Sequence, residues 1–182
     1  MTPFESLSPP YRVIYADPPW HFKLRSEVNL TKSPQGQYAC MSLEDIRALP
    51  VWELAAPSAV LVLWATAPML PEAFSVMAAW GFNFKTAGAW AKRSTTNSSW
   101  AFGTGYIYRS AAEFWLLGTR GKPVSLSHAE RNLIVAPRRE HSRKPAEMRE
   151  KLRRQFAGPY LELFARERTE GWDGWGNEFP DS

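Results

Sequence analysis

Cysteine is nearly absent from this sequence of 182 residues, and several other features are missing with it. Because Cys40 is the only cysteine, neither an intrachain disulfide nor a cysteine-rich metal site can form. His21, His128 and His141 are scattered without metal-ligand spacing, so we expect no metal. We find no repeat, low-complexity tract or domain boundary, which predicts a single domain over residues 1–182.

Long apolar runs are missing as well. The longest, around residues 59–67, is far too short to span a bilayer. The first residues, MTPFESLSPPYR, include an acid and three prolines where a signal peptide needs an apolar segment. We therefore expect a soluble, cytoplasmic protein with no membrane partner, either a monomer or a homodimer.

Neither sign of charge dominates the composition. Lysine and arginine total 22 against 18 acidic residues, and a net charge of +4 is too small to argue for a polyanionic partner. The distribution is uneven, because eight basic residues and three glutamates lie between Arg138 and Arg154. Such a run is typical of a solvated helix face or of a phosphate-contacting edge. Charge reversal at Arg143, Lys144 or Arg149 should weaken nucleic-acid binding only in the second case.

Aromatic residues, by contrast, are abundant. Hydrophobic residues make up 45% of the chain, which indicates a globular protein. Nine tryptophans and an aromatic content of 14% exceed what one core of this size needs. We therefore expect some of the rings at a binding surface, where they can stack on planar ligands.

Apolar strand patterns alternate with helical patterns along most of the chain. Strands are predicted at 13–16, 58–66, 82–91, 112–121, 132–137 and 160–166. Helices are predicted within 41–50, 71–82 and 142–159, with Ser42 as an N-cap, Pro71 in a first turn, and Gly81 and Gly158 as helix ends. This order predicts a Rossmann-like three-layer α/β/α fold around a mostly parallel sheet.

Polar groups follow three of the predicted strands. Asp17, Lys92 and Arg166 each stand at a strand end, and ligands of open α/β sheets bind at the carboxyl ends of strands. Two polar loops, at 23–39 and 93–109, are long enough to be substrate loops. We therefore expect a site at this edge, with the Asp17 carboxylate facing an open cleft rather than closed in a salt bridge.

The segment ADPPW at residues 16–20 is the most specific signal. Asp-Pro-Pro-Trp should occur by chance in only about one in several thousand chains of this length. Neither Pro18 nor Pro19 has an amide to donate, so the first strand must end there in a stiff turn. A rigid acidic turn at a strand end can place hydrogen-bond acceptors with little reorganisation.

The chain resembles the METTL-type adenine-N6 methyltransferases, which include the catalytic subunit that methylates adenosine in messenger RNA and bacterial and phage relatives. ADPPW carries the resemblance. The segments QYACMSLEDI, WAKR, HSRKP, LELFAR and GWGNE continue it in the family's order. The chain departs from the family pattern at Ala165, at Arg168 with Thr169, and at Glu178.

The resemblance implies methylation of the exocyclic N6 amine of adenine in nucleic acid, with S-adenosyl-L-methionine as cofactor. Two acceptors, the Asp17 carboxylate and the Pro18 carbonyl, would hold the amine while Trp20 and Tyr38 contact the base. The predicted catalytic residues are Asp17, Pro18, Pro19 and Trp20. The predicted substrate-binding residues are Tyr38, Lys92, Arg143 and Lys144. The predicted cofactor-binding residues are Asp17, Lys92, Arg166, Arg168, Asn177 and Glu178.

Other interpretations remain open at this point. Cytosine-C5 methylation is disfavoured because Cys40 does not follow a proline, whereas cytosine-N4 methylation uses a similar turn. A catalytically inactive nucleic-acid-binding subunit is disfavoured by the intact turn. We expect DNA rather than RNA as the partner, because the short chain resembles the minimal bacterial and phage DNA-modifying members. A target base must leave its stack, or lie in a single strand, to be reached.

Overall fold

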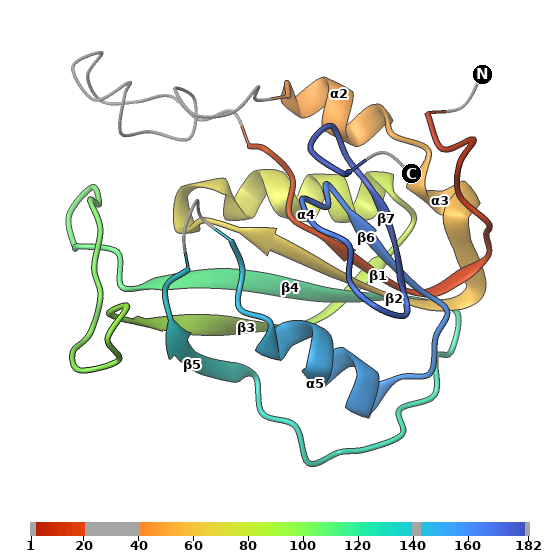
Figure 1. Cartoon of the computed structure of the whole chain (residues 1–182). Helices are drawn as coiled ribbons and strands as arrows, with labels where there is room; N and C mark the ends of the chain where they lie inside the picture. Colours follow the sequence, from red (N-terminus) through yellow and green to blue (C-terminus); the bar gives the residue numbers. More distant parts are fainter. Residues whose placement is uncertain (1–2, 21–40, 140–142, 181–182) are drawn as a thin grey trace.

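One mixed sheet forms the centre of the molecule (Figure 1). The computed structural model describes residues 3–20, 41–139 and 143–180. Seven strands pair in the order β5-β3-β4-β2-β1-β6-β7. Their bounds are β1 Tyr11–Ala16, β2 Ala55–Ala65, β3 Asn83–Arg93, β4 Ala112–Arg120, β5 Leu133–Pro137, β6 Tyr160–Leu163 and β7 Trp172–Trp175. All neighbours are parallel except β4, which runs antiparallel to β2 and β3.

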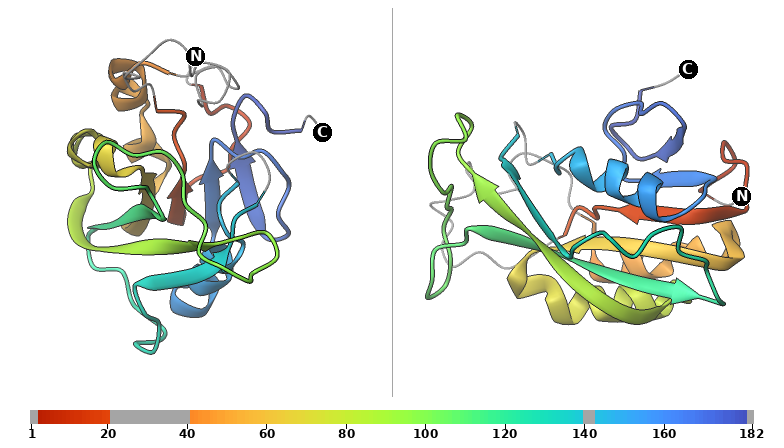
Figure 2. Two further views of the ribbon diagram at one scale, coloured as in Figure 1. Left: turned by 90° about the vertical axis from the view of Figure 1, so that its left-hand side faces the viewer. Right: turned by 90° about the horizontal axis from the view of Figure 1, so that it is seen from below.

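Helices cover both faces of this sheet (Figure 2). On one side lie α2 (Leu43–Ala48), α3 (Val51–Leu54), the 3-10 turn η2 (Ala67–Met69) and α4 (Leu70–Ala79). On the other side lies α5 (Glu147–Gln155). The predicted three-layer, mostly parallel Rossmann-like fold is therefore confirmed. None of the helices in the described ranges has the length and apolar character needed to cross a membrane.

Residues 13–16 of β1 and 59–65 of β2 are buried without interruption, as expected for strands that are covered on both faces. In β1, Val13 and Tyr15 belong to the core under α5, whereas Ile14 and Ala16 belong to the core under α2, α3 and α4. Strand β2 alternates in the same way, with Val60, Val62 and Trp64 facing α5 and Leu61, Leu63 and Ala65 facing α4. Two cores, one on each side of the sheet, hold the strand ends in place.

Local signals placed two of the helices correctly. The Ser42 hydroxyl accepts a hydrogen bond from the Asp45 amide at 3.1 Å, as an N-cap should. Gly81 has φ +81° and ends α4, with the amides of Gly81 and Phe82 donating to the carbonyls of Ala78 and Met77. This is the left-handed C-terminal cap for which glycine is favoured.

The third helix is shorter than predicted. It begins at Glu147 rather than near residue 142, because Pro145 disfavours helical backbone at the residue before it. It ends at Gln155, since Phe156 is extended and packs into the core, so Gly158 is not its C-cap. Strand β7 was not predicted at all.

Candidate active site

Asp17 directly follows the carboxyl end of β1 and belongs to a turn that several hydrogen bonds hold in place. The amide of Trp20 donates to the Pro18 carbonyl at 2.8 Å, and the amide of Met41 donates to the Pro19 carbonyl at 3.1 Å. The Trp20 indole N–H donates to the carbonyl of Trp64, at the end of β2, at 3.0 Å. Only 6% of Trp20 is exposed. Its observed contacts therefore fasten the turn to the core, and its predicted stacking on a base stays a prediction.

A chain of alternating charges starts at Asp17. Its Oδ2 lies 2.7 Å from Nζ of Lys144, and the same Nζ lies 3.1 Å from Oε2 of Glu113. Oε1 of Glu113 in turn accepts a hydrogen bond from Lys92. Lys144 also lies over the Trp64 ring, 5.6 Å from its centroid. The four groups Asp17, Lys144, Glu113 and Lys92 form one network across the edges of β1, β3 and β4.

The groups at the middle of this network are ionised. Burial alone would raise the pKa of Glu113, but the ammonium groups of Lys144 and Lys92 outweigh it and hold that pKa below its ordinary value. Burial alone would lower the pKa of Lys144, but the carboxylates of Asp17 and Glu113 outweigh it and raise that pKa. Glu113 and Lys144 therefore both stay charged at neutral pH.

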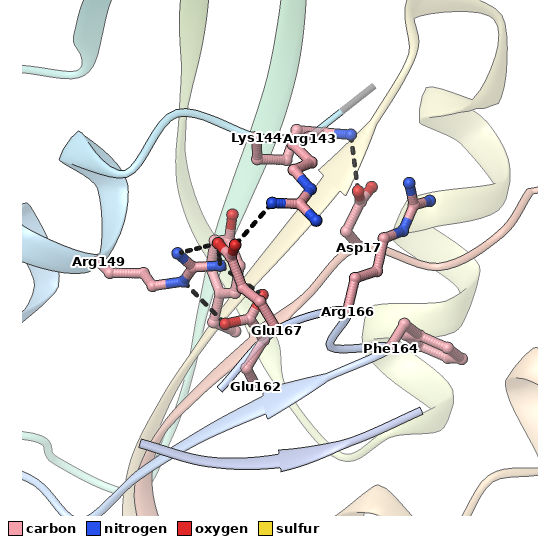
Figure 3. Close-up of a pocket in the computed structure, with 9 residues that line it drawn as sticks. Asp17, Arg143, Lys144, Arg149, Glu162, Phe164, Arg166 and Glu167 are labelled. Carbon is pink, nitrogen blue, oxygen red and sulfur yellow. Dashed lines mark hydrogen bonds and ion pairs between the residues drawn. The ribbon is translucent and has the colours of Figure 1, made fainter. Parts of the chain in front are cut away.

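A second cluster of charges lies beside the first, around Glu167 (Figure 3). Arg149 of α5 makes a two-pronged ion pair with Glu162 of β6, at 2.8 and 3.0 Å, and also contacts Glu167 at 3.2 Å. Arg143 donates to Oε2 of Glu167 at 2.8 Å, and Arg139 lies 3.8 Å from Oε1, the oxygen that Arg149 also contacts. Burial raises the pKa of Glu162, because Arg149 only partly offsets the loss of water.

A small pocket of about 30 Å³ opens between the two clusters (Figure 3). It is lined by Tyr15, Asp17, Arg143, Lys144, Arg149, Glu162, Phe164, Arg166 and Glu167. Phe164 follows β6 with φ +61°, a left-handed conformation that is unfavourable for a bulky residue. Strain of this kind is often found at functional sites. Here it coincides with a pocket wall.

The expectation for Asp17 is confirmed in part. Its carboxylate is ion-paired, contrary to expectation, yet its side chain stays 22% exposed and lines the pocket. Arg166 lines the same pocket, and Lys92 is linked to it through Glu113 and Lys144. The three predicted strand ends therefore do meet at one edge of the sheet, as their positions in parallel strands require.

Other predicted site residues lie further away. Arg168 is exposed, donates to the Pro180 carbonyl at 3.1 Å and lies over the Phe179 ring. Glu178 is half exposed and lies 3.8 Å from Arg166, while Asn177 is exposed. Neither Arg168 nor Asn177 lines the pocket. Tyr38 falls outside the described residues.

Sequence reasoning missed several residues of this site. Glu162 pairs in register with Tyr15 across β6 and β1, and an acid inside the apolar strand YLELF was a signal that could have found it. Glu113 had no such signal, because its position depends on the direction of β4. The basic run at 138–154 was also misinterpreted in part. Lys144 and Arg149 are only 11% and 13% exposed, so these two charges serve internal ion pairs.

Fold and site together fit one class of protein. A three-layer fold around a mostly parallel sheet, with a polar pocket at the carboxyl ends of its strands, is compatible with the Rossmann-like fold of S-adenosylmethionine-dependent methyltransferases. A family model described as MT-A70 matches residues 11–178, nearly the whole chain. The chain belongs to the MT-A70 family, which confirms the resemblance.

Curated relatives point the same way. Type II methyltransferase M.MunI of Mycoplasma sp is 31% identical over 191 residues, covering 94% of this chain and 79% of that protein. N(6)-adenine-specific methyltransferase METTL4 of Homo sapiens is 28% identical, covering 98% of this chain but 39% of its own length. N6-methyladenosine RNA methyltransferase MTA1 of Pyricularia oryzae is 27% identical, and the match covers 94% of this chain and 47% of that protein. The chain thus spans less than half of the latter two relatives.

Proposed function

We propose that this protein methylates the N6 amine of adenine in DNA, with S-adenosyl-L-methionine as methyl donor. The observation that carries the proposal is the Asp17 carboxylate on a stiff, fastened turn at the carboxyl edge of the sheet, facing a charged pocket. Membership of the MT-A70 family supports adenine-N6 methylation and the use of this cofactor. Relatives named for adenine-specific and for RNA methylation support the reaction but represent both classes of nucleic acid.

The turn offers two acceptors to the two hydrogens of the amine. The Asp17 carboxylate supplies one, and it stabilises the positive charge that develops on nitrogen during methyl transfer. The Pro18 carbonyl supplies the other. That carbonyl already accepts from the Trp20 amide, but a carbonyl oxygen has two lone pairs, so one remains for the substrate. The pair of acceptors would orient the nitrogen lone pair, which in adenine is delocalised into the ring.

Lys144 holds the Asp17 carboxylate until substrate arrives. Its ammonium group has two carboxylate partners, Asp17 at 2.7 Å and Glu113 at 3.1 Å. When Asp17 turns to the adenine amine, Lys144 stays paired with Glu113. No buried charge is then left without a partner, which would otherwise be costly. Glu113 therefore acts as a positioning residue for Lys144.

The pocket residues match the charges of the cofactor. S-adenosyl-L-methionine supplies an electrophilic methyl group when bound. Arg143, Lys144 and Arg166 present cations to its carboxylate, Glu167 presents an anion to its positive groups, and Phe164 presents an aromatic wall. A pocket of about 30 Å³ is small, so the side chains of Arg143 and Lys144 must move to admit the cofactor.

DNA is favoured over RNA because this short chain resembles the minimal bacterial and phage DNA-modifying members of the family. Of the relatives named above, M.MunI is the one that this chain spans over most of its length. The intact Asp-Pro-Pro-Trp turn also argues against an inactive binding subunit.

Methyl transfer from radiolabelled S-adenosyl-L-methionine to matched DNA and RNA oligonucleotides tests the proposal. Mass spectrometry of the digested products should find N6-methyladenine in DNA only with the wild-type protein and not with Asp17→Ala. Methylation of RNA alone would overturn the choice of DNA. Transfer to neither, by a protein that binds both cofactor and oligonucleotide, would overturn the enzymatic function.

A further inference from the structure

Large apolar side chains are concentrated on one exposed connection. The segment 94–110, here called the aromatic loop, joins β3 to β4 at the carboxyl edge of the sheet (Figure 1). It carries five of the twelve exposed large apolar side chains of the described residues. They are Trp100 (56% exposed), Phe102 (56%), Tyr106 (53%), Ile107 (88%) and Tyr108 (86%). Such a concentration on a surface indicates a binding site.

Backbone hydrogen bonds hold the aromatic loop against the candidate active site. The amide of Lys92 donates to the Ala111 carbonyl at 2.9 Å, and the amide of Ala101 donates to the Lys92 carbonyl at 2.9 Å. Further along, the amide of Gly103 donates to the Ser110 carbonyl at 2.7 Å. Lys92 is the same residue that pairs with Glu113 in the charge network. The rings of the loop thus extend from the active-site edge.

The charges of the loop favour an anionic partner. No acidic residue occurs between Lys92 and Glu113. The Arg93 guanidinium lies over the Trp100 ring at 4.7 Å, and the Arg109 guanidinium lies over the Phe102 ring at 4.8 Å. Rings interleaved with arginine combine two properties that single-stranded nucleic acid requires, namely flat surfaces for bases and positive charge for phosphates.

We propose that the aromatic loop is a stacking platform for unpaired DNA bases that flank the target adenine. This inference rests on the proposed function for its choice of DNA. Bases beside the target stack on Trp100 and Tyr108, while Arg93 and Arg109 contact the neighbouring phosphates. The loop thereby holds the strand open next to Asp17. A protein partner would gain from the apolar rings but would not explain the absence of acids.

Fluorescence anisotropy with a fluorescein-labelled single-stranded DNA about 12 nucleotides long tests the platform. The double variant Trp100→Ala/Tyr108→Ala should bind about tenfold or more weakly than the wild type. Trp100→Phe/Tyr108→Phe keeps the rings and should bind normally. Phe74→Ala is the matched control, because Phe74 is also an exposed aromatic residue (42%) but lies on α4. Equal melting temperatures check that all variants fold.

A second DNA probe, in which the nucleotides beside the target adenine lack bases, separates stacking from charge. Wild-type affinity should fall with this probe, whereas the affinity of the double alanine variant should not fall further. Unchanged affinity of the double variant for the complete probe would overturn the platform. The platform for DNA would also be overturned if the double alanine variant lost affinity for RNA of the same sequence but kept its affinity for DNA.

Methyl transfer measured in the same samples separates this inference from the proposed function. Wild-type protein that methylates DNA, with a double variant that binds DNA normally, overturns the platform alone. Wild-type protein that binds DNA through the loop but transfers no methyl group overturns the proposed function and supports the platform.

Discussion

The charge network and the aromatic loop, which lie at the carboxyl edge of the sheet, differ in whether their side chains have partners within the protein. In the charge network, Asp17, Lys144, Glu113 and Lys92 all find partners within the protein. In the aromatic loop, large apolar side chains stand in solvent although the backbone around them is hydrogen-bonded. Groups that are paired internally are already placed for chemistry, whereas exposed rings gain their free energy only when a ligand covers them. The same edge thus holds a prebuilt site and an unfilled surface.

Removing Asp17 tests the prebuilt side most strongly. We expect Asp17→Ala to lower kcat for methyl transfer by about 10³-fold or more, because one of two acceptors for the amine is lost. Lys144 keeps Glu113 as a partner, so the fold should persist. Calorimetry with S-adenosyl-L-methionine should show largely retained affinity. Affinity lost in parallel with activity would instead assign Asp17 mainly to the cofactor.

Glu113→Gln tests how much the charge network contributes to stability, because Glu113 pairs with both lysines of the network. The variant leaves two partly buried ammonium groups with one carboxylate, so we expect the free energy of unfolding to fall by about 3 kcal/mol at pH 7. Urea denaturation measures this loss. Glu44→Gln, at an exposed position on α2, serves as the control.

The stability difference between the wild type and Glu113→Gln should depend on pH, and it should be larger at neutral pH than in acid. The pKa of Glu113 is lowered in the folded protein, so its stabilising contribution is present above its ordinary pKa of 4.5. It disappears as the pH falls through the lowered folded value. The stability difference between wild type and Glu113→Gln should therefore be full at pH 7 and shrink in acid. A constant difference would contradict the ion-pair origin.

Arg143 tests the second cluster of charges, around Glu167, which lies beside the charge network. Its side chain is 39% exposed and pairs with Glu167 at 2.8 Å, so it can exchange this internal partner for a phosphate. Arg143→Glu should weaken DNA binding a few-fold and lower the salt slope by about 1. Arg47→Glu on α2 should change neither. An unchanged slope for Arg143→Glu would leave DNA binding to the aromatic loop.

The smallest effect is expected far from the site, at Glu130. Hydrogen bonds from Arg154 and Lys151 lower the pKa of Glu130 from 4.5 to about 2. Its contribution to stability is therefore present above pH 4.5 and lost as the pH falls through 2. Glu130→Gln should cost about 1 kcal/mol at pH 7, and this cost should shrink as the pH falls towards and below 2, as measured by thermal unfolding. Methyl transfer at pH 7 should not change.

Features that depend on neighbouring residues were predictable from the sequence. The Asp-Pro-Pro turn, the Ser42 cap and the Gly81 cap follow from backbone restrictions and local hydrogen bonds. Alternation of strands and helices predicted the three layers, and strand ends predicted where Asp17, Lys92 and Arg166 gather.

Features that depend on tertiary contacts were not predictable. Nothing in AEFWLLGTR reveals that β4 runs against its neighbours, so the arrival of Glu113 at the site was missed. The basic run could not show which of its charges are buried, because Glu162 and Glu167 meet it only in the fold. Strand β7, WDGW, is four residues long with a glycine inside, too little to signal a strand.

The antiparallel direction of β4 has a consequence for the position of the aromatic loop. Because β4 returns along β3, the connection between them begins and ends at the active-site rim and carries no strand of the sheet. If the aromatic loop contacts the bases beside the target, as proposed, exchanging that segment between family members would change target preference and leave the acidic turn in place. Under the proposed function, target preference and the chemical step would then lie on separate segments of the chain.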